Sequence, residues 1–268
     1  MTILYQKSTN KMLNKYLKFD FISKNGSKIY QADNFFSHEF YDELDKSFPE
    51  LDEKNFKKKN DDKFSLEINT EIFEKISNHN NALLKFKNLI NSNNFKKKLY
   101  WKIFYKLILS NKDNIFKTLK FFRPPKFESG HKSIFDIIYS KIKVDCEFSY
   151  IKNKGKIVPH VDSQKELFTF VIYFPKFDNN NKLSQIEKNY GTSFWNSKIK
   201  NNTNKHLTDD LEEKEFKNNS QIHFQSKYIK NKCCGFVRNN RSWHTVEPLD
   251  ISPDYVRRSI NINYILIN

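Results

Sequence analysis

Apolar residues recur at two different spacings along this chain, and the change between them divides it into two regions. Between about Glu71 and Lys120 they return every three or four positions, for example in ALLKFKNLI and LYWKIFYKLIL, which predicts helices. After about Lys143 the chain favours β-branched and aromatic residues, which are typical of strands. Four strands are predicted there, in the runs KVDCEFSYI, ELFTFVIYFP, CCGFVRN and RRSININYILI.

The earlier segment KIYQADNFFSHEFYDELDKSFPEL combines a strand pattern with a helix pattern. Ser37 can cap the helix, and Phe40 and Leu44 fall on one face of it. A short strand, a turn and a capped helix are therefore predicted. The polar stretch from Asn55 to Asp62 is predicted to be a loop.

Helical patterns followed by strand patterns are typical of an α+β fold in which helices brace an antiparallel β core. A chain of 268 residues can bury one sizeable core, so we expect a single domain. Residues 1–142 would form a mostly helical support region, and residues 143–268 the β core. Between residues 196 and 232 lies a charged, Asn-rich insertion that looks too polar for the core, and we expect either a surface loop or a lid.

The chain is strongly basic, with 47 Lys and Arg against 31 Asp and Glu, a formal charge of +16. Such a charge raises the question of a polyanionic partner, either nucleic acid or an anionic membrane surface. Only five of the basic residues are arginine, however, and the lysines are spread along the chain without one dominant block. Because specific recognition favours arginine, we interpret the charge as a solvated lysine surface.

The cysteines and the apolar runs indicate the compartment. Three cysteines, two of them adjacent at Cys233 and Cys234, argue against a disulfide framework and favour a reducing environment. The first residues lack the apolar stretch and cleavage site of a secretory signal. No run of about 18 apolar residues occurs, so no transmembrane segment is predicted. We therefore expect a soluble, cytoplasmic protein without a membrane partner.

His160 is the one histidine with an acidic residue two positions later, in His160-Val-Asp162 directly before a predicted strand. Alternate side chains of a strand point to the same side, so His160 and Asp162 can share one site. His244, in the motif Ser-Trp-His, is a candidate third ligand. Two imidazoles and one carboxylate form the facial triad of non-haem Fe(II) oxygenases, although zinc hydrolases use the same residue types. The alternatives are a surface turn for the pair and a core position for His244.

The last predicted strand, RRSININYI, separates polar from mostly apolar side chains by alternation. Its polar face comprises Arg257, Ser259, Asn261 and Asn263. An arginine fork beside a hydroxyl could clamp a carboxylate bidentately within an otherwise apolar core. Arg257 and Ser259 are therefore candidate anion ligands, and the alternative is a strand-edge charge that discourages pairing with another chain.

Four short motifs together resemble the Fe(II)- and 2-oxoglutarate-dependent oxygenases, nearest to the prolyl-4-hydroxylase-like branch. The motifs are His160-Val-Asp162, Gly191-Thr-Ser-Phe194, Ser242-Trp-His244 and Arg257-Arg-Ser259. Their order and spacing, over roughly residues 144–268, carry the resemblance more than any single motif does. The segment DNFFSHEFYDELDKSFP is similar to the strand-and-helix entry of such proteins.

The resemblance implies a double-stranded β-helix, the jelly roll of cupin-like proteins, braced by the N-terminal helices. It also implies that His160, Asp162 and His244 bind Fe(II). The implied activity is that of a dioxygenase, which hydroxylates an unactivated C–H bond with O2 while 2-oxoglutarate is converted to succinate and CO2. Asp162 speaks against the halogenating relatives, in which a small residue replaces this carboxylate.

Contacts to the cosubstrate follow from the same resemblance. Arg257, assisted by Ser259, would pair with the C5 carboxylate of 2-oxoglutarate. Tyr150, ten residues before the first metal ligand, matches a tyrosine that often contacts the cosubstrate in this branch. Tyr173, on the strand after His160-Val-Asp162, matches another.

The resemblance leaves the substrate class open. A peptidyl side chain, a free amino acid, a glycan or another small metabolite would all fit it. One alternative is a nucleic-acid demethylase of the same superfamily, suggested by the +16 charge and the aromatic content. That class usually carries a denser arginine signature on its C-terminal strand than this chain has. A second alternative is a non-enzymatic binding protein on a degenerate barrel, which would have no reason to retain the triad together with Arg257.

Overall fold

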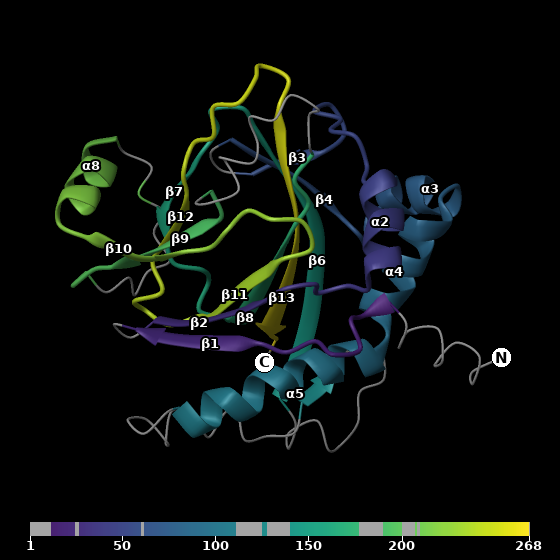
Figure 1. Ribbon diagram of the computed structural model, residues 1–268, viewed down its shortest axis with the longest axis horizontal. Helices are drawn as coiled ribbons and strands as arrows, with labels where there is room; N and C mark the ends of the chain where they lie inside the picture. Colours follow the sequence, from purple (N-terminus) through teal and green to yellow (C-terminus); the bar gives the residue numbers. More distant parts are fainter. Residues whose placement is uncertain are drawn as a thin grey trace.

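The computed structural model describes residues 12–24, 27–59, 62–110, 125–127, 140–176, 190–199, 207 and 210–267. Their strands form two β-sheets, and helices cover one side of the larger sheet (Figure 1). Within these residues, no helix has both the length and the apolar character needed to cross a membrane.

The larger sheet has nine strands among the described residues, and its pairings are antiparallel except for that of one short strand. In spatial order the strands are β1 (Asp20–Lys24), β2 (Ser27–Ala32), β11 (Cys233–Val237), β8 (Glu166–Tyr173), β13 (Val256–Leu266), β6 (Ser140–Lys152), β4 (Lys63–Glu67) and β3 (Lys57–Lys58). The short strand β5 (Pro125–Phe127) pairs in parallel with β6. The long C-terminal strand β13 therefore lies between β8 and β6 in the middle of this sheet.

The smaller sheet is antiparallel and has four strands in the described part of the chain. In spatial order they are β10 (Gln221–Gln225), β9 (Thr192–Asn196), β12 (His244–Val246) and β7 (Ile157–His160). Residues of both sheets line one cavity, so the sheets face each other across it. Gly191, just before β9, permits a close approach to the next segment, because a Cβ there would overlap the Ser226 hydroxyl.

Four helices pack on the face of the larger sheet that points away from the cavity. They are α2 (His38–Lys46), α3 (Glu71–Asn78), α4 (Asn81–Asn91) and α5 (Asn93–Ser110). In Figure 1, α2, α3 and α4 lie together beside the sheet, and α5 crosses below it. A fifth helix, α8 (Asp210–Asn218), lies on the other side of the molecule near the smaller sheet (Figure 1).

Strand β13 shows how alternation separates the core from the cavity. Ile260, Ile262 and Tyr264 are fully buried in the main hydrophobic core, which they share with residues of the N-terminal helices. The Tyr264 hydroxyl donates to the backbone carbonyl of Lys96 in α5 at 3.0 Å. The other face of the strand lines the cavity with Arg257, Ser259, Asn261 and Asn263.

The main elements agree with the sequence patterns. The four strand runs expected after Lys143 correspond to β6, β8, β11 and β13, and the helical pattern from Glu71 corresponds to α3, α4 and α5. Residues 111–120 of that pattern lie outside the described residues. Mainly β structure in two facing sheets, with five described helices, is consistent with a jelly roll.

Two local expectations near the N-terminal end need correction. The stretch from Asn55 to Asp62, expected to be a loop, contains β3, because Lys57 and Lys58 pair with β4. Ser37 does occupy the N-cap of α2, but its side chain makes no capping hydrogen bond. Ser37 therefore has the backbone conformation of an N-cap residue, but its hydroxyl does not cap the helix.

The expectation that the insertion is too polar for the core is also wrong. Residues 196–232 include α8 and β10, and Phe216 and Tyr228 are each 1% exposed. Each of these two aromatic residues is flanked by polar residues in the sequence. No apolar period is visible around them, so their burial was not predicted. Phe216 packs against Trp195 and Trp243, and Tyr228 packs against Arg257.

Candidate metal centre and cavity

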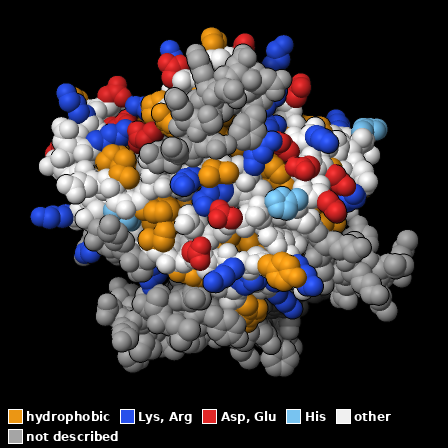
Figure 2. Space-filling view, viewed as in Figure 1, with side chains coloured by type: hydrophobic (Ala, Val, Ile, Leu, Met, Phe, Trp, Pro, Cys, Tyr) orange, Lys and Arg blue, Asp and Glu red, His pale blue; other side chains and the backbone are white. Residues whose placement is uncertain are grey.

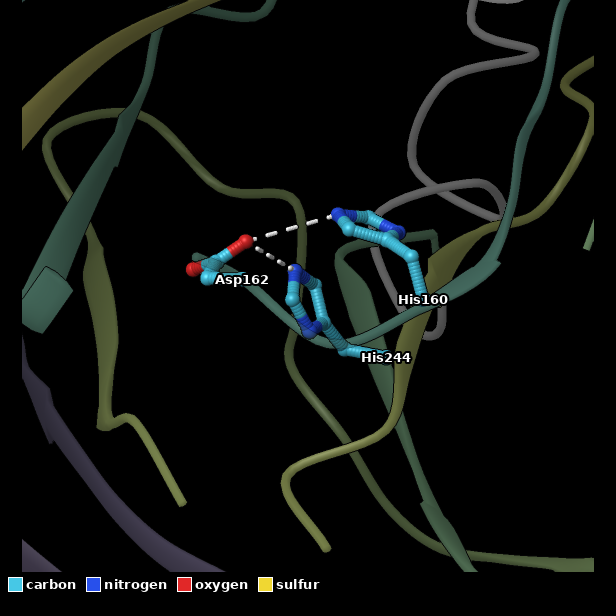
Figure 3. Close-up of side chains that lie close together, drawn as sticks. All are labelled: His160, Asp162 and His244. Carbon is cyan, nitrogen blue, oxygen red and sulfur yellow. Dashed lines mark ion pairs between the residues drawn. The ribbon is translucent and has the colours of Figure 1, made fainter. Parts of the chain in front are cut away.

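The two histidines of the candidate site come from neighbouring strands of the smaller sheet. His160 ends β7, His244 begins β12, and the two residues are register partners in that antiparallel pair. Asp162 follows two residues later, where the chain leaves β7. Figure 3 shows the two rings and the carboxylate turned toward one another. The structure therefore brings together the three residues singled out from the sequence.

The spacing of these three side chains suits a single metal ion. Asp162 Oδ1 lies 3.5 Å from His160 Nε2 and 3.5 Å from His244 Nε2. One potential ligand atom from each residue lies within 4.8 Å of the others, and in the described part of the chain this is the one such group. Bonds of about 2.1 Å at right angles separate ligand atoms by about 3 Å, so the two distances from Asp162 to the histidines need to shorten by only about 0.5 Å.

Hydrogen bonds to the backbone set the tautomers of both histidines. His160 Nδ1 lies 2.9 Å from the Val158 carbonyl, and His244 Nδ1 lies 3.0 Å from the Ser242 carbonyl. A carbonyl oxygen only accepts, so each Nδ1 carries the proton and each Nε2 directs its lone pair at Asp162. This is the arrangement that metal-binding histidines usually have, with the second nitrogen held by an outer acceptor.

Asp162 is held in its ionised form. Burial alone would raise its pKa, but the proximity of the His244 and His160 rings outweighs burial and lowers the pKa. Its Oδ2 also accepts a long hydrogen bond, of 3.4 Å, from the Thr169 hydroxyl. Burial and the neighbouring Asp162 raise the pKa of Glu166 to about 8, so this carboxyl stays protonated beside the ionised one.

The triad opens into a cavity of about 330 Å³ between the two sheets. This volume is near the lower end of the range found for small-molecule sites. The apolar part of its wall is formed by Ile151, Ile157, Val171, Phe236 and Val246. The polar part includes four residues of β13 as well as Lys63 of β4 and Glu147 of β6, so several strands contribute charged or polar groups.

Arg257 lies at a buried end of this cavity. The residue is 5% exposed, and its guanidinium carbon lies 4.8 Å from the centre of the Tyr228 ring. Its Nη1 has no hydrogen-bond partner among the described residues. A buried cationic donor without a partner is costly, so this nitrogen indicates a place for an anion. The adjacent Arg258 points to the other face, where its Nη2 lies 2.6 Å from Asp45 Oδ1.

The other residues expected to contact a cosubstrate are placed differently. Ser259 lines the cavity, and its hydroxyl donates to Asn261 Oδ1 at 3.3 Å. Tyr173 is not among the lining residues, although its ring lies 5.9 Å from the Arg257 guanidinium carbon. Its hydroxyl forms a hydrogen bond of 2.5 Å with the Ser226 hydroxyl. Tyr173 therefore packs beside Arg257 without lining the cavity.

The structure does not bring Tyr150 to the cavity, which corrects the expectation for this residue. On β6 the lining residues are Glu147, Ser149 and Ile151, and alternation turns Tyr150 to the opposite face. Its hydroxyl donates to the Pro49 carbonyl at 2.9 Å within the helix-covered core.

A charged wall made of Lys59, Lys63 and Glu147 forms another side of the cavity, and nothing in the sequence patterns indicated it. Glu147 Oε1 lies 2.5 Å from Lys63 Nζ, and its Oε2 lies 3.1 Å from Lys59 Nζ. Burial would raise the pKa of Glu147, but the two lysines outweigh it and lower the pKa to about 2. The wall therefore contains one carboxylate and two ammonium groups, all ionised.

Helix α8 supports the metal ligands from behind the smaller sheet. Its Phe216 packs on Trp243, the residue before His244, with ring centroids 4.7 Å apart. Val161, between the other two ligands, is fully buried in the same cluster. A salt bridge of 2.7 Å between Lys156 and Glu213 ties the helix to the segment that leads into β7. The described part of the insertion is thus a support for the ligands.

Comparisons with known proteins give weak similarity only. No protein-family model matches the chain, and no curated protein matches it. Among solved structures, a prolyl-4-hydroxylase from Pseudomonas putida is 10% identical, with a TM-score of 0.41 over 89% of this chain and 92% of that one. A prolyl hydroxylase from Trichoplax adhaerens, solved in complex with a hypoxia inducible factor oxygen degradation domain peptide, is 11% identical, with a TM-score of 0.42 over 98% and 91%. Similarities of this size carry no argument about chemistry, which rests on the geometry above.

Proposed function

We propose that this chain is an Fe(II)- and 2-oxoglutarate-dependent oxygenase on a double-stranded β-helix, which hydroxylates an unactivated C–H bond of a small molecule or a peptidyl side chain. One observation carries the proposal. The His160, Asp162 and His244 group shares a cavity with Arg257, a buried arginine whose Nη1 has no partner among the described residues. A metal site alone would fit many enzymes, whereas a metal site with a separate buried cation fits a dianionic cosubstrate.

The donor set suits Fe(II). Two neutral imidazoles and one carboxylate are the ligands of non-haem Fe(II) oxygenases and leave coordination positions for other molecules. Asp162 supplies the negative charge, and the backbone carbonyls of Val158 and Ser242 fix both rings with Nε2 toward the site. Zinc hydrolases use the same residue types, and Arg257, whose Nη1 has no partner among the residues described, is what favours the oxygenase.

The cosubstrate contacts fit at the other end. Arg257 Nη1 would donate to the distal carboxylate of 2-oxoglutarate, and Ser259 lines the cavity on the same face of β13. The Tyr228 and Tyr173 rings beside the guanidinium limit the positions it can take, so the arginine is oriented before the anion arrives.

When bound, Fe(II) and 2-oxoglutarate supply the oxidation: the substrate C–H, 2-oxoglutarate and O2 become the hydroxylated product, succinate and CO2. The chain itself binds, orients and excludes water. Phe236 packs on the His244 ring with centroids 4.4 Å apart, and Val171 and Val246 line the cavity nearby. These apolar groups keep bulk water from the reacting region.

A ligand titration tests the proposal. Protein freed of metal is titrated under nitrogen with Fe(II) and then with 2-oxoglutarate, and the visible metal-to-ligand charge-transfer absorption of the chelate is followed. We expect the absorption in the wild type and its loss in Asp162→Ala. Arg257→Met should weaken 2-oxoglutarate binding by at least about tenfold, because charged hydrogen bonds are lost.

The neighbouring Arg258→Met is the matched control, since Arg258 points away from the cavity toward Asp45. It should leave the dissociation constant for 2-oxoglutarate unchanged. Absence of the absorption in folded wild-type protein would contradict the proposal. Equal effects of the two arginine variants would show that Arg257 does not bind the cosubstrate.

A further inference from the structure

The charged wall lies across β13 from the two strands that contact the metal ligands. In the larger sheet the order of strands is β11, β8, β13, β6, β4. Phe236 and Thr169, which contact His244 and Asp162, belong to β11 and β8. Lys63 and Glu147 belong to β4 and β6, on the other side of β13. The cavity therefore extends from the metal ligands toward a second polar region, in which Lys63 lies one strand away from Arg257, each being a register partner of Ile151.

The composition of this wall exceeds what a structural ion pair needs. Glu147 has an 8% exposed side chain and accepts from Lys63, from Lys59 and from Asn261 Nδ2 at 3.2 Å. One lysine would be enough to neutralise it. The wall itself contains one more ammonium group than carboxylate, and each ammonium has three donors, of which Glu147 uses one. Glu67 lies 3.5 Å from Lys59, but both side chains are well exposed, so water screens this pair.

A hydrogen-bond acceptor lies on the same face of the cavity. Asn263 Oδ1 is buried and has no partner among the described residues. Asn263 is the register partner of Thr169, whose hydroxyl contacts Asp162. A ligand that fits this region therefore carries an anionic group for the lysines and a hydrogen-bond donor for the asparagine.

The size of the cavity limits the ligand further. Its volume of about 330 Å³ has to accommodate 2-oxoglutarate beside Arg257 as well as the substrate. The space that remains beside the cosubstrate is smaller than the roughly 300 Å³ at which small-molecule sites start, so it suits only a small substrate.

We propose that Lys59 and Lys63, held in place by Glu147, form an anion-binding subsite for the primary substrate, and that this substrate is a small carboxylate with a hydrogen-bond donor, of the type of a free α-amino acid. The inference rests on the proposed function, because that function assigns the Arg257 end to 2-oxoglutarate. The two lysines are specificity-determining residues, whereas Glu147 positions them.

The test uses matched pairs of probes on the anaerobic complex of the protein with Fe(II) and 2-oxoglutarate. The probes are the proteinogenic L-amino acids and their α-amides, which keep the ammonium group but lack the carboxylate. Binding is read from the change in the visible absorption of the chelate, without turnover. We expect at least one amino acid to bind at least about tenfold more tightly than its amide, as a charged hydrogen bond implies.

Two variants connect this preference to the wall. Lys63→Met should reduce the preference for the acid over the amide to within about twofold and leave the dissociation constant for 2-oxoglutarate unchanged. Lys59→Met, which retains the Lys63 to Glu147 pair, should reduce the preference partly. Lys57→Met is the matched control, because Lys57 is an exposed residue of the same hairpin outside the cavity. It should change nothing.

The outcomes separate this inference from the function on which it rests. If the wild type gives no chelate absorption, both the oxygenase function and the anion-binding subsite are refuted. If the absorption forms but no amino acid binds, or acids and amides bind equally, the subsite alone is refuted. Weaker binding of 2-oxoglutarate in Lys63→Met, with normal binding in Arg257→Met, would mean that the lysines hold the cosubstrate, which also refutes the subsite.

Discussion

The contact between Phe216 and Trp243 tests whether α8 holds the metal ligands in position. Phe216 is 1% exposed and packs on Trp243, which directly precedes His244. Replacing a buried phenylalanine by alanine costs about 3–5 kcal/mol in a well-packed core. Because α8 has nine residues and lies at the surface, where neighbours can relax, we expect the lower end, about 3 kcal/mol.

The same replacement should weaken metal binding. Trp243 and Val161 share the cluster with Phe216, and they are the chain neighbours of all three ligands. Loss of support around a metal ligand typically lowers affinity by about 10- to 100-fold. We therefore expect Phe216→Ala to raise the Fe(II) dissociation constant by at least about tenfold at a temperature where the variant is fully folded.

The assay pairs two measurements on each variant: urea unfolding for stability and anaerobic Fe(II) titration for affinity. Leu211→Ala is the control on the same helix, since Leu211 is 76% exposed, and it should alter neither quantity. Phe216→Leu serves as a milder variant if the alanine variant does not fold. If Phe216→Ala lowers stability but leaves the Fe(II) dissociation constant within about twofold, the helix does not position the ligands and the reasoning is refuted.

Two further predictions concern residues outside the metal ligands. Glu147 has a folded pKa of about 2, below the ordinary 4.5, so its contribution to stability is present above pH 4.5 and is lost as the pH falls toward 2. The pKa is lower by about 2.5, which corresponds to about 3 kcal/mol of unfolding free energy. Glu147→Gln should therefore be less stable than the wild type in urea at pH 7. This loss of stability should largely vanish near pH 2. A difference that persists there would contradict this role. Tyr150→Phe should cost about 1 kcal/mol through the lost hydrogen bond to Pro49 and leave 2-oxoglutarate affinity unchanged. Weaker cosubstrate binding in that variant would show that Tyr150 does reach the cavity.

Basic and acidic side chains are mixed on the face of the molecule that Figure 2 shows. On the face shown in Figure 2, Lys and Arg side chains are interspersed with Asp and Glu side chains and form no continuous basic area. This agrees with the interpretation of the lysines as a solvated surface. It gives no support to a nucleic-acid partner from that face.

The sequence predicted the long strands and the pair of His160 and Asp162 because each is a local signal. Strand β13 alternates polar and apolar residues from Ser259 to Tyr264, and His160-Val-Asp162 lies directly before β8. The shorter strands β7 and β12 have four and three residues, too few for a period to be visible. Neither was predicted as a strand, and only the histidines that they carry were singled out.

The wrong prediction for Tyr150 and the failure to predict the charged wall have one cause. Distance along the sequence does not give the register between paired strands. Tyr150 lies ten residues before His160 along the chain, but its place in β6 turns it toward the helices. The charged wall joins Lys63 to Glu147 across 84 positions, and only the pairing of β4 with β6 brings them together. Such contacts depend on sheet topology, which local patterns do not encode.

The most direct test of the oxygenase function is the fate of 2-oxoglutarate under ¹⁸O2. Protein loaded with Fe(II) is incubated with 2-oxoglutarate under ¹⁸O2. The succinate is quantified, and its isotopic mass is determined by mass spectrometry. We predict that the wild type forms succinate with one labelled oxygen atom and that His160→Ala and Asp162→Ala form none above the rate of free Fe(II). Wild-type protein that is folded and contains Fe(II), yet forms no more labelled succinate than these variants, would contradict the assignment.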